Sequence, residues 1–298
     1  MNNNELSYQA HINNWNSRTS ERDERLFHLI NKNCINYQLQ KRTLDVLKPF
    51  VKSKSSWLTV GDYNGLEANY LLNQGQDAVA SDISDYFLIE AQKEHLINEY
   101  SQVNVEKIHY NDNSFDYLFC KEAFHHFPKA YLGLYEMIRC SRKATIMIEP
   151  IDVLSKMPLL LFVKNVLDLF NPNLINKLWK NRFSFETVGN YVFKISEREI
   201  EKIAMGMGLT CIAFKRINLI LDLKADKTII NQAPINQSNW KKILKRIRVL
   251  NFLSATHLIP YNHLYCVMFK EKPDATVIES MKSLDYVILD LPENPYLK

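Results

Sequence analysis

The chain has 298 residues, of which 46% are hydrophobic and 23% are charged, a composition that is ordinary for a globular protein with one large domain. Its formal net charge of +4 is too small to indicate nucleic-acid binding, and its polar N-terminus lacks the apolar core of a secretion signal. No apolar run reaches the ~18 residues of a membrane-spanning helix. We therefore expect a cytoplasmic protein with no nucleic-acid partner.

Cysteine usage agrees with that expectation. None of the five cysteines belongs to a C-x-x-C pair, and most lie in apolar surroundings. This pattern favours small core residues over a disulfide framework or a zinc site. The five are Cys34, Cys120, Cys140, Cys211 and Cys266.

The first fifty residues are predicted to be mostly helical. From Glu21 to Phe50, leucine and isoleucine recur at spacings near three and four, and Pro49 marks an end. Residues 1–50 are therefore expected to form a helical cap that precedes a main domain at 51–272.

Strand and helix patterns then alternate. Apolar strand-like runs occur at 57–60, 77–84, 115–120 and 144–150, and helical patterns lie between them at 66–73, 87–96 and 130–140. This alternation predicts a parallel sheet with helices on both faces. The nearly continuous apolar character of "ATIMI" is typical of a strand that is covered on both faces.

The rhythm breaks after Pro150, where residues 151–195 show no clear strand. A helix begins at Ser196, which with Glu199 forms a predicted capping box. Strands are predicted at 210–221 and 263–271, with a second helical insertion at 222–261 between them. The last segment, 273–298, is expected to be a C-terminal tail.

A glycine turn follows the first predicted strand, in "VGDYNG". The chain has only 7 glycines, yet Gly61, Gly65 and Gly75 fall within one short stretch. A strand that ends at such a turn places backbone N–H groups and a helix N-terminus beside a ligand. Asp82 closes the second strand, 17 residues after Gly65, near the ~20 expected for a carboxylate that binds a ribose.

Titratable groups cluster after the strand in "NDNSFDYLFCKEAFHHF". In open α/β sheets, ligands bind at the carboxyl ends of the strands, where this cluster should lie. If a helix begins near Lys121, Glu122 lies one turn from both His125 and His126. A Glu–His dyad there would raise the basicity of the ring and fix its tautomer. His125 is the first candidate for a general base and His126 the second.

These motifs together resemble those of class I S-adenosylmethionine-dependent methyltransferases. The match covers about 57–150, with weaker support from 196–272, and "DNSFD" before the fourth strand is its most specific part. The resemblance implies an α/β fold with a Rossmann-like, doubly wound and mostly parallel seven-stranded sheet. The last strand, "HLYCVMFKE", would be antiparallel, and the insertions would form helical lids.

The resemblance also implies a cofactor, S-adenosylmethionine, with S-adenosylhomocysteine as product. No metal site is predicted, because two nearby acids without a clear third ligand are weak evidence for one. Gly61 and Gly65 would approach the methionine part of the cofactor, with Asp62 or Glu67 near the amino group. Asp82 would bind the ribose, Ile83 would pack on the adenine, and Lys121 and Glu122 would lie beside the cofactor. The segment that reads the adenine edge would contain Asn104, Val105 and Glu106.

Three positions depart from the usual family pattern. Tyr63 stands near the place of a middle glycine, Thr59 where many members carry an acid, and Asn104 where aspartate is common. The altered loop leaves open a weak cofactor site. Glu149 and Asp152, which flank the end of the fifth strand, could contact an acceptor, bind a metal or lie in a solvated loop.

The implied reaction is methyl transfer, an in-line displacement that depends on positioning and, for a hydroxyl acceptor, on a base. Several segments are also similar to methyltransferases of bacterial surface-polysaccharide biosynthesis, which favours a sugar hydroxyl on a glycan or activated sugar. The basic stretch "KKILKRIR" predicts an amphipathic helix at about 240–250. That helix is either a plain surface helix or a contact for an anionic acceptor, a membrane surface or an enzyme complex.

Three other functions stay open at this point. The chain could methylate oxygen or nitrogen of another small metabolite. It could be a catalytically weak S-adenosylmethionine-binding partner protein, an idea that the altered glycine loop supports. A nicotinamide-dependent oxidoreductase is disfavoured, because "GDYNG" lacks the G-x-G-x-x-G spacing.

Overall fold

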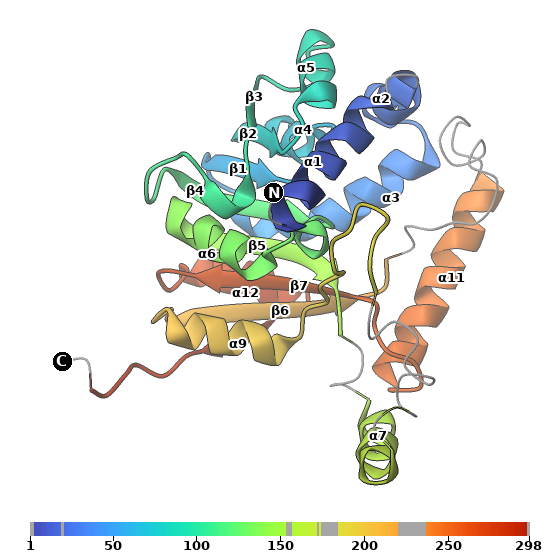
Figure 1. The fold of residues 1–298 in the computed structure, drawn as a ribbon, viewed down its shortest axis with the longest axis vertical. Helices are drawn as coiled ribbons and strands as arrows, with labels where there is room; N and C mark the ends of the chain where they lie inside the picture. The colour runs from blue at the N-terminus through green and yellow to red at the C-terminus, as the bar shows by residue number, and fades with distance from the viewer. Residues whose placement is uncertain are drawn as a thin grey trace.

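The computed structural model describes residues 3–18, 21–152, 157–171, 173, 184–219 and 237–296, which surround one central sheet (Figure 1). The sheet has eight strands in the order β3-β2-β1-β4-β5-β7-β6-β8. Strands β1 to β5 pair in parallel, whereas β7 is antiparallel to both β5 and β6. The strands are β1 (Ser56–Val60), β2 (Asp77–Asp82), β3 (Glu99–Gln102), β4 (Phe115–Lys121), β5 (Ser141–Pro150), β6 (Cys211–Ile217), β7 (His263–Phe269) and β8 (Val287–Asp290).

Helices cover both faces of this sheet and an N-terminal group lies over one end (Figure 1). The α-helices are α1 (Asn3–Asn16), α2 (Arg22–Ile30), α3 (Ile35–Leu44), α4 (Leu66–Asn73), α5 (Tyr86–Lys93), α6 (Ala130–Cys140), α7 (Pro158–Phe170), α9 (Glu197–Gly206), α11 (Gln237–Ala255) and α12 (Ala275–Ser283). Short 3-10 helices are η2 (Asp45–Phe50), η3 (Val105–Lys107) and η4 (Phe124–His126).

Two hydrophobic cores lie on opposite faces of the sheet, because successive strand residues point to opposite sides. On β1, Trp57 belongs to the core beneath η2, α4 and α12, whereas Leu58 belongs to the core beneath α6 and α9. Strands β4 and β7 are buried along almost their whole length. This explains why their sequences show apolar runs instead of an alternating pattern.

The expected architecture is confirmed, with one correction to the strand number. Eight strands are present where seven were predicted, because the segment 273–298 is more than a tail. Its residues form α12 and the edge strand β8, which pairs antiparallel with β6. The short edge strand β3 was also absent from the strand patterns read from the sequence. Both edge strands have only four residues and are half-exposed, so neither carries an apolar pattern.

The two predicted insertions contain α7 and α11, respectively. Other parts of those insertions, at 153–156, 172, 174–183 and 222–236, lie outside the described residues. Among the helices that the structure describes, none is both long enough and apolar enough to cross a membrane.

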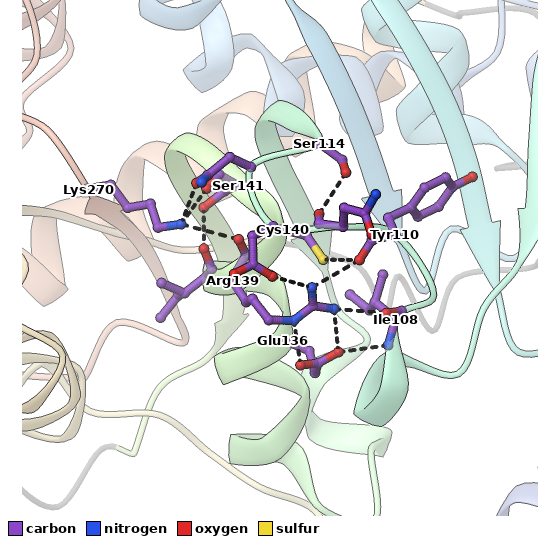
Figure 2. Close-up of polar contacts among 12 residues, drawn as sticks. Ile108, Tyr110, Ser114, Glu136, Arg139, Cys140, Ser141 and Lys270 are labelled. Atoms are coloured by element: carbon purple, nitrogen blue, oxygen red, sulfur yellow. Dashed lines mark hydrogen bonds and ion pairs between the residues drawn. The ribbon is translucent and has the colours of Figure 1, made fainter.

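The "DNSFD" motif lies at the edge of the sheet where β4 begins, opposite the strands' carboxyl ends. There the Arg139 guanidinium donates to the carbonyls of Ile108 and Tyr110, at 2.8 and 3.0 Å, and to the Glu136 carboxylate (Figure 2). Asp116 accepts from the backbone N–H of Ser56 at 3.0 Å. The most specific family motif therefore holds the turn before β4 in place and does not contribute to the ligand-binding edge.

The strand order determines where a ligand can bind. Strand β1 lies between β2 and β4, so the chain leaves β1 in one direction and later returns to its other side. At such a switch point the connecting segments diverge and leave a crevice at the carboxyl ends of the strands. The segments that follow β1, β2 and β4 therefore border the candidate site.

Candidate active site

A cavity of about 570 Å³ occupies this crevice. Its floor comes from the strand ends, through Gly61, Asp82 and Glu122, and its walls include the segment 185–188. Helix α1 closes one side and contributes Tyr8, His11, Asn14 and Trp15. The volume lies within the range of small-molecule and cofactor pockets.

Gly61 is required where β1 ends. Its φ is +71°, and a Cβ built on it would lie 2.2 Å from the Cβ of Ala123. Gly65, with φ of +76°, precedes α4 as its N-cap residue. Both glycines therefore allow the turn to pass close to neighbouring residues, Ala123 and Ile97. This requirement explains why glycines cluster in this stretch of the sequence.

We expect Gly61→Ala to destabilise the protein by about 2–4 kcal/mol, because it adds a steric clash to the cost of a positive φ. Gly75→Ala is the matched control, since Gly75 has φ of +77° but no atom within 4 Å of a built Cβ. Urea denaturation followed by circular dichroism measures both losses. Equal losses for the two variants would show that the approach to Ala123 has no energetic consequence.

Asp82 is the strongest ligand-binding candidate among the strand-end residues. Its side chain is buried and borders the cavity, and it accepts a hydrogen bond from the backbone N–H of Ser84 at 3.0 Å. No described cation pairs with it within 4.0 Å. Burial raises its pKa to about 7, although the N–H groups of Ser84 and Ile83 oppose the shift. A carboxylate in this state gains from any hydroxyl donors that a ligand brings.

Only part of the segment 104–106, which was expected to contact an adenine, lines the cavity. Ile83, Val103 and Val105 line it. The Asn104 side chain instead accepts from the N–H of Glu106 at 2.9 Å and so caps η3. The Glu106 carboxylate accepts from the N–H of Lys129 at 2.7 Å. The apolar members of the segment thus face the ligand space, and the side chains of Asn104 and Glu106 are engaged elsewhere.

Asp62 and Lys121 are placed differently from the sequence-based prediction. The Asp62 carboxylate accepts from the Thr59 hydroxyl at 2.8 Å and from the N–H of Ala68 at 2.9 Å, so it caps α4 inside the protein. Lys121 forms a buried ion pair of 2.7 Å with Glu67. None of these four side chains borders the main cavity; Lys121 and Glu67 line a smaller one of about 160 Å³ beside it.

The electrostatics of this cap follow from burial. Burial and the neighbouring Glu67 carboxylate hold the pKa of Asp62 well above its usual range. Burial also acts to raise the pKa of Glu67, but the Lys121 ammonium outweighs it and the net shift is downward. At the position of Thr59 the family pattern often has an acid. Here the Thr59 hydroxyl donates a hydrogen bond to Asp62 instead.

Tyr63, which replaces the expected glycine, takes part in an aromatic cluster. Its ring stacks on Trp15 of α1, with 4.5 Å between centroids and 10° between planes, and meets Phe87 edge-on. Tyr63 also borders both the main cavity and the smaller one. The Tyr63 ring thus holds α1 against the turn and lies at the border of the two cavities.

Removal of this stack should weaken ligand binding in the main cavity. We expect Trp15→Ala to reduce cofactor affinity roughly 10-fold, because an aromatic pair contributes up to about 1.5 kcal/mol beyond its buried area. Leu6→Ala, at a position that is 50% exposed on the same helix, is the control and should leave the affinity unchanged. Calorimetric titration measures both. Unchanged affinity in Trp15→Ala would mean that α1 does not close the site.

The predicted dyad of Glu122 with His125 and His126 is wrong. No helix begins at Lys121, because strand β4 ends there. Glu122 has φ of +55°, so it does not share a helix with the two histidines. Glu122 Oε1 instead lies 2.6 Å from Nε2 of His263 on β7. Each histidine of the pair has a different carboxylate as its partner.

His125 is paired with Glu149, the penultimate residue of β5. Its Nδ1 lies 2.7 Å from Glu149 Oε2, while Oε1 accepts from the N–H groups of Ala123 and Phe124 at 2.9 Å each. Burial lowers the pKa of His125, but Glu149, with help from Glu122 and Glu186, outweighs it, so the pKa is raised. Glu149 is fully buried, which excludes the solvated-loop interpretation.

His126 is the histidine that borders the cavity, together with Glu186. Its Nδ1 lies 2.8 Å from Glu186 Oε2, and its ring centroid is 4.0 Å from that of His125. Ligand atoms of His125, His126 and Glu186 all lie within 4.8 Å of one another, a set that could hold a metal ion. Of the two histidines, His126 therefore faces the ligand space and His125 lies behind it.

Several residues of the site carried no usable signal in the sequence. Trp15 and His11 lie on a polar helix without an apolar stripe, and Glu186 lies in an insertion without a strand pattern. In the sequence, Glu149 is distinguished only as one of two acids at a strand end. Only chain folding brings these residues to the site of His126, across sequence separations of 23 to 115 residues.

Comparisons with known proteins agree with this geometry. Residues 58–148 match the family model described as "Methyltransferase domain". No curated protein sequence matches the chain. Among solved structures, similar folds include a putative methyltransferase of Haloferax volcanii in complex with the Trm112 activator. Its TM-score is 0.52 at 12% identity, covering 88% of this chain and 99% of that one.

Magnesium protoporphyrin IX methyltransferase from Synechocystis PCC 6803 is similar in two forms. With bound SAM the TM-score is 0.51 at 11% identity, covering 89% of this chain and 97% of that one. With bound SAH it is 0.50 at 14% identity, covering 89% and 100%. At these identities the likeness establishes the fold alone, and the domain match supports methyltransferase activity. The chain thus has the Rossmann-like methyltransferase fold, and its residues 58–148 match a methyltransferase domain.

Proposed function

We propose that the protein transfers a methyl group from S-adenosylmethionine to a hydroxyl group of a small acceptor. The observation that carries this proposal is the buried Asp82 carboxylate, which borders a cofactor-sized cavity beside the Gly61 turn and has no described cation as partner. That arrangement suits a ribose with two vicinal hydroxyls. The methyltransferase-domain match supports the same cofactor.

In this proposal the cofactor lies across the strand ends. Its adenine packs among Ile83, Val103 and Val105, and its ribose hydroxyls donate to Asp82. Its methionine part passes Gly61 toward α1. Arg18 borders the cavity there and is suited to the methionine carboxylate, because a guanidinium binds carboxylates in a planar, bidentate manner.

The acceptor would lie between the cofactor's methyl group and His126. Methyl transfer requires the acceptor oxygen, methyl carbon and sulfur in line, and the acceptor hydroxyl must lose its proton. His126, paired with Glu186 at 2.8 Å, is the proposed base, with His125 and Glu149 behind it. Glu122 borders the same space and is proposed to position the acceptor.

A sugar hydroxyl is the proposed acceptor, on the strength of the sequence similarity to polysaccharide-pathway methyltransferases. The competing acceptor is another small metabolite methylated on oxygen or nitrogen. An amine already carries a free electron pair at neutral or higher pH when its pKa is low, so it needs the histidine less. Loss of activity in His126→Ala toward a sugar, with Asp82-dependent binding retained, would favour the hydroxyl acceptor.

The helix α11 is proposed as a contact surface for an anionic partner. It carries five lysine or arginine residues and no acid, and Phe252 near its end is 67% exposed. An anionic membrane surface or an acidic acceptor fits this charge. Salt-sensitive binding of the protein to vesicles with anionic lipid, but not to neutral vesicles, tests the membrane form of the proposal.

The proposed cofactor can be tested without knowledge of the acceptor. Titration of the full chain with S-adenosylmethionine and with S-adenosylhomocysteine should give 1:1 binding of each. A panel of sugars, nucleotide sugars and amines with methyl-labelled cofactor then identifies the acceptor. Absence of binding of either cofactor form to the wild-type protein would refute the proposed function.

A further inference from the structure

Three histidines and three glutamates lie in close pairs at and behind the His126 end of the cavity. The pairs His125–Glu149, His126–Glu186 and His263–Glu122 are all contacts of 2.6–2.8 Å between a carboxylate and a ring nitrogen. Imidazole nitrogens and carboxylate oxygens are also the side-chain ligands that zinc and related ions take in proteins.

From this cluster we infer that His125, His126 and Glu186 bind a divalent transition-metal ion at the acceptor end of the cavity. Two histidines and one glutamate are a known ligand set for catalytic zinc, which leaves a fourth position open for a substrate oxygen. The three ligand atoms lie within 4.8 Å of one another. Ligands at ~2.1 Å from one ion are at most about 4 Å apart, so small side-chain rotations close the site.

The contact between His126 and Glu186 supports this inference most directly. Nδ1 of His126 lies 2.8 Å from Glu186 Oε2, yet this buried atom makes no hydrogen bond of acceptable geometry. Two ligands of one tetrahedral ion at ~2.1 Å lie ~3.4 Å apart and do not point at each other. A small side-chain rotation would convert the observed contact into that arrangement.

Glu149 supplies the orienting partner that metal-binding histidines usually have. It holds Nδ1 of His125 at 2.7 Å, which fixes the tautomer with Nε2 free to accept a metal. Glu149 is itself held by the N–H groups of Ala123 and Phe124. His126 and Glu186 border the cavity, so the open position of the ion faces the place proposed for the acceptor.

The role of the ion rests on the proposed function, although its binding does not. An acceptor hydroxyl bound at the open position would become more acidic and would be held in line with the methyl group. The hydroxyl proton would then pass to solvent or to a nearby carboxylate, and the oxygen would attack the methyl carbon as the carbon–sulfur bond breaks. His126 would act as a ligand in this state and not as the base.

Direct titration tests the inference. The full chain, without a polyhistidine tag and after treatment with a chelator, should bind one Zn²⁺ by calorimetry. Co²⁺ in its place should give the visible absorption of a four- or five-coordinate ion. His126→Ala and Glu186→Gln should each weaken Zn²⁺ binding by more than about 100-fold, since removal of outer-shell partners alone costs about 10–100-fold.

Matched controls separate this site from surface binding. His109→Ala removes an exposed histidine that lies outside the cluster and should leave Zn²⁺ affinity unchanged. Each variant is also titrated with S-adenosylmethionine, which shows that it is folded and tests the cofactor proposal separately. Absence of 1:1 metal binding in the wild type, or equal binding by wild type and both cluster variants, overturns the inference even where the cofactor binds.

Discussion

Asp82→Asn is expected to weaken S-adenosylmethionine binding on the order of 100-fold and, at the same time, to stabilise the unliganded protein above neutral pH. The first effect follows from loss of charge-assisted hydrogen bonds to the ribose, each of which contributes about 1.5–3 kcal/mol. The second follows from burial, which raises the pKa of Asp82 to about 7. Asparagine keeps the acceptor for the N–H of Ser84, so the turn should persist.

The pH dependence of both effects has a definite sign. Because the folded-state pKa is raised above the unfolded value of ~3.9, the contribution of Asp82 to stability is present below pH ~4 and is lost as pH rises through about 7. A shift of about three units corresponds to at most ~4 kcal/mol. The stabilisation by Asp82→Asn should therefore be larger at pH 8 than at pH 5.

Cofactor binding should show the opposite trend in the wild type. Ribose hydroxyls favour the ionised carboxylate, so affinity should rise as pH increases from 6 to 8, and the Asp82→Asn variant should lose this part of the dependence. Thermal unfolding and calorimetric titration at several pH values measure the two effects. A variant that is less stable than wild type at pH 8, yet binds normally, would assign Asp82 a purely structural role.

The fold could be predicted from the sequence because its signals are local. The apolar runs of β4 and β5, the glycines of the turn and the capping box at Ser196 each depend on residues close together in the chain. Ser196 donates and accepts with Glu199 as that motif predicts. Strands β3 and β8 were missed because edge strands of four half-exposed residues gain little from apolar side chains.

The candidate site was less predictable because its contacts are long-range. Asp82 and Gly61 are placed by strand ends, and such positions can be read from the strand pattern. The partners of the histidines cannot, because they depend on how β5, β7 and an insertion meet β4. Glu122, with φ of +55°, follows the end of β4 where a helix was expected, so it pairs with His263 instead of His125 or His126.

Glu149→Gln is expected to reverse the tautomer of His125 while leaving the fold intact. The glutamine oxygen can occupy the place of Oε1 and keep the N–H groups of Ala123 and Phe124 satisfied. Its NH₂ group would then face Nδ1 of His125, where Oε2 now lies at 2.7 Å. Since NH₂ can only donate, Nδ1 must accept, and the ring proton moves to Nε2.

This change should cut methyl transfer by on the order of 100-fold, the lower end of what proton-transfer groups contribute. With Nε2 protonated, His125 lacks the lone pair that would ligate an ion unless the ring returns to its other tautomer. The same substitution should therefore weaken Zn²⁺ binding at the inferred site by about 10–100-fold, while S-adenosylmethionine still binds. Nitrogen chemical shifts of the labelled imidazole report the tautomer directly.

The variant also separates the two roles proposed for the histidine cluster. If turnover falls while wild-type and variant proteins both lack a bound metal, then the His126 base, oriented through His125, carries the chemistry. If turnover and Zn²⁺ binding fall together and added metal restores neither, then the ion carries it. A reversed tautomer with undiminished turnover would exclude both, and would leave catalysis to positioning of cofactor and acceptor alone.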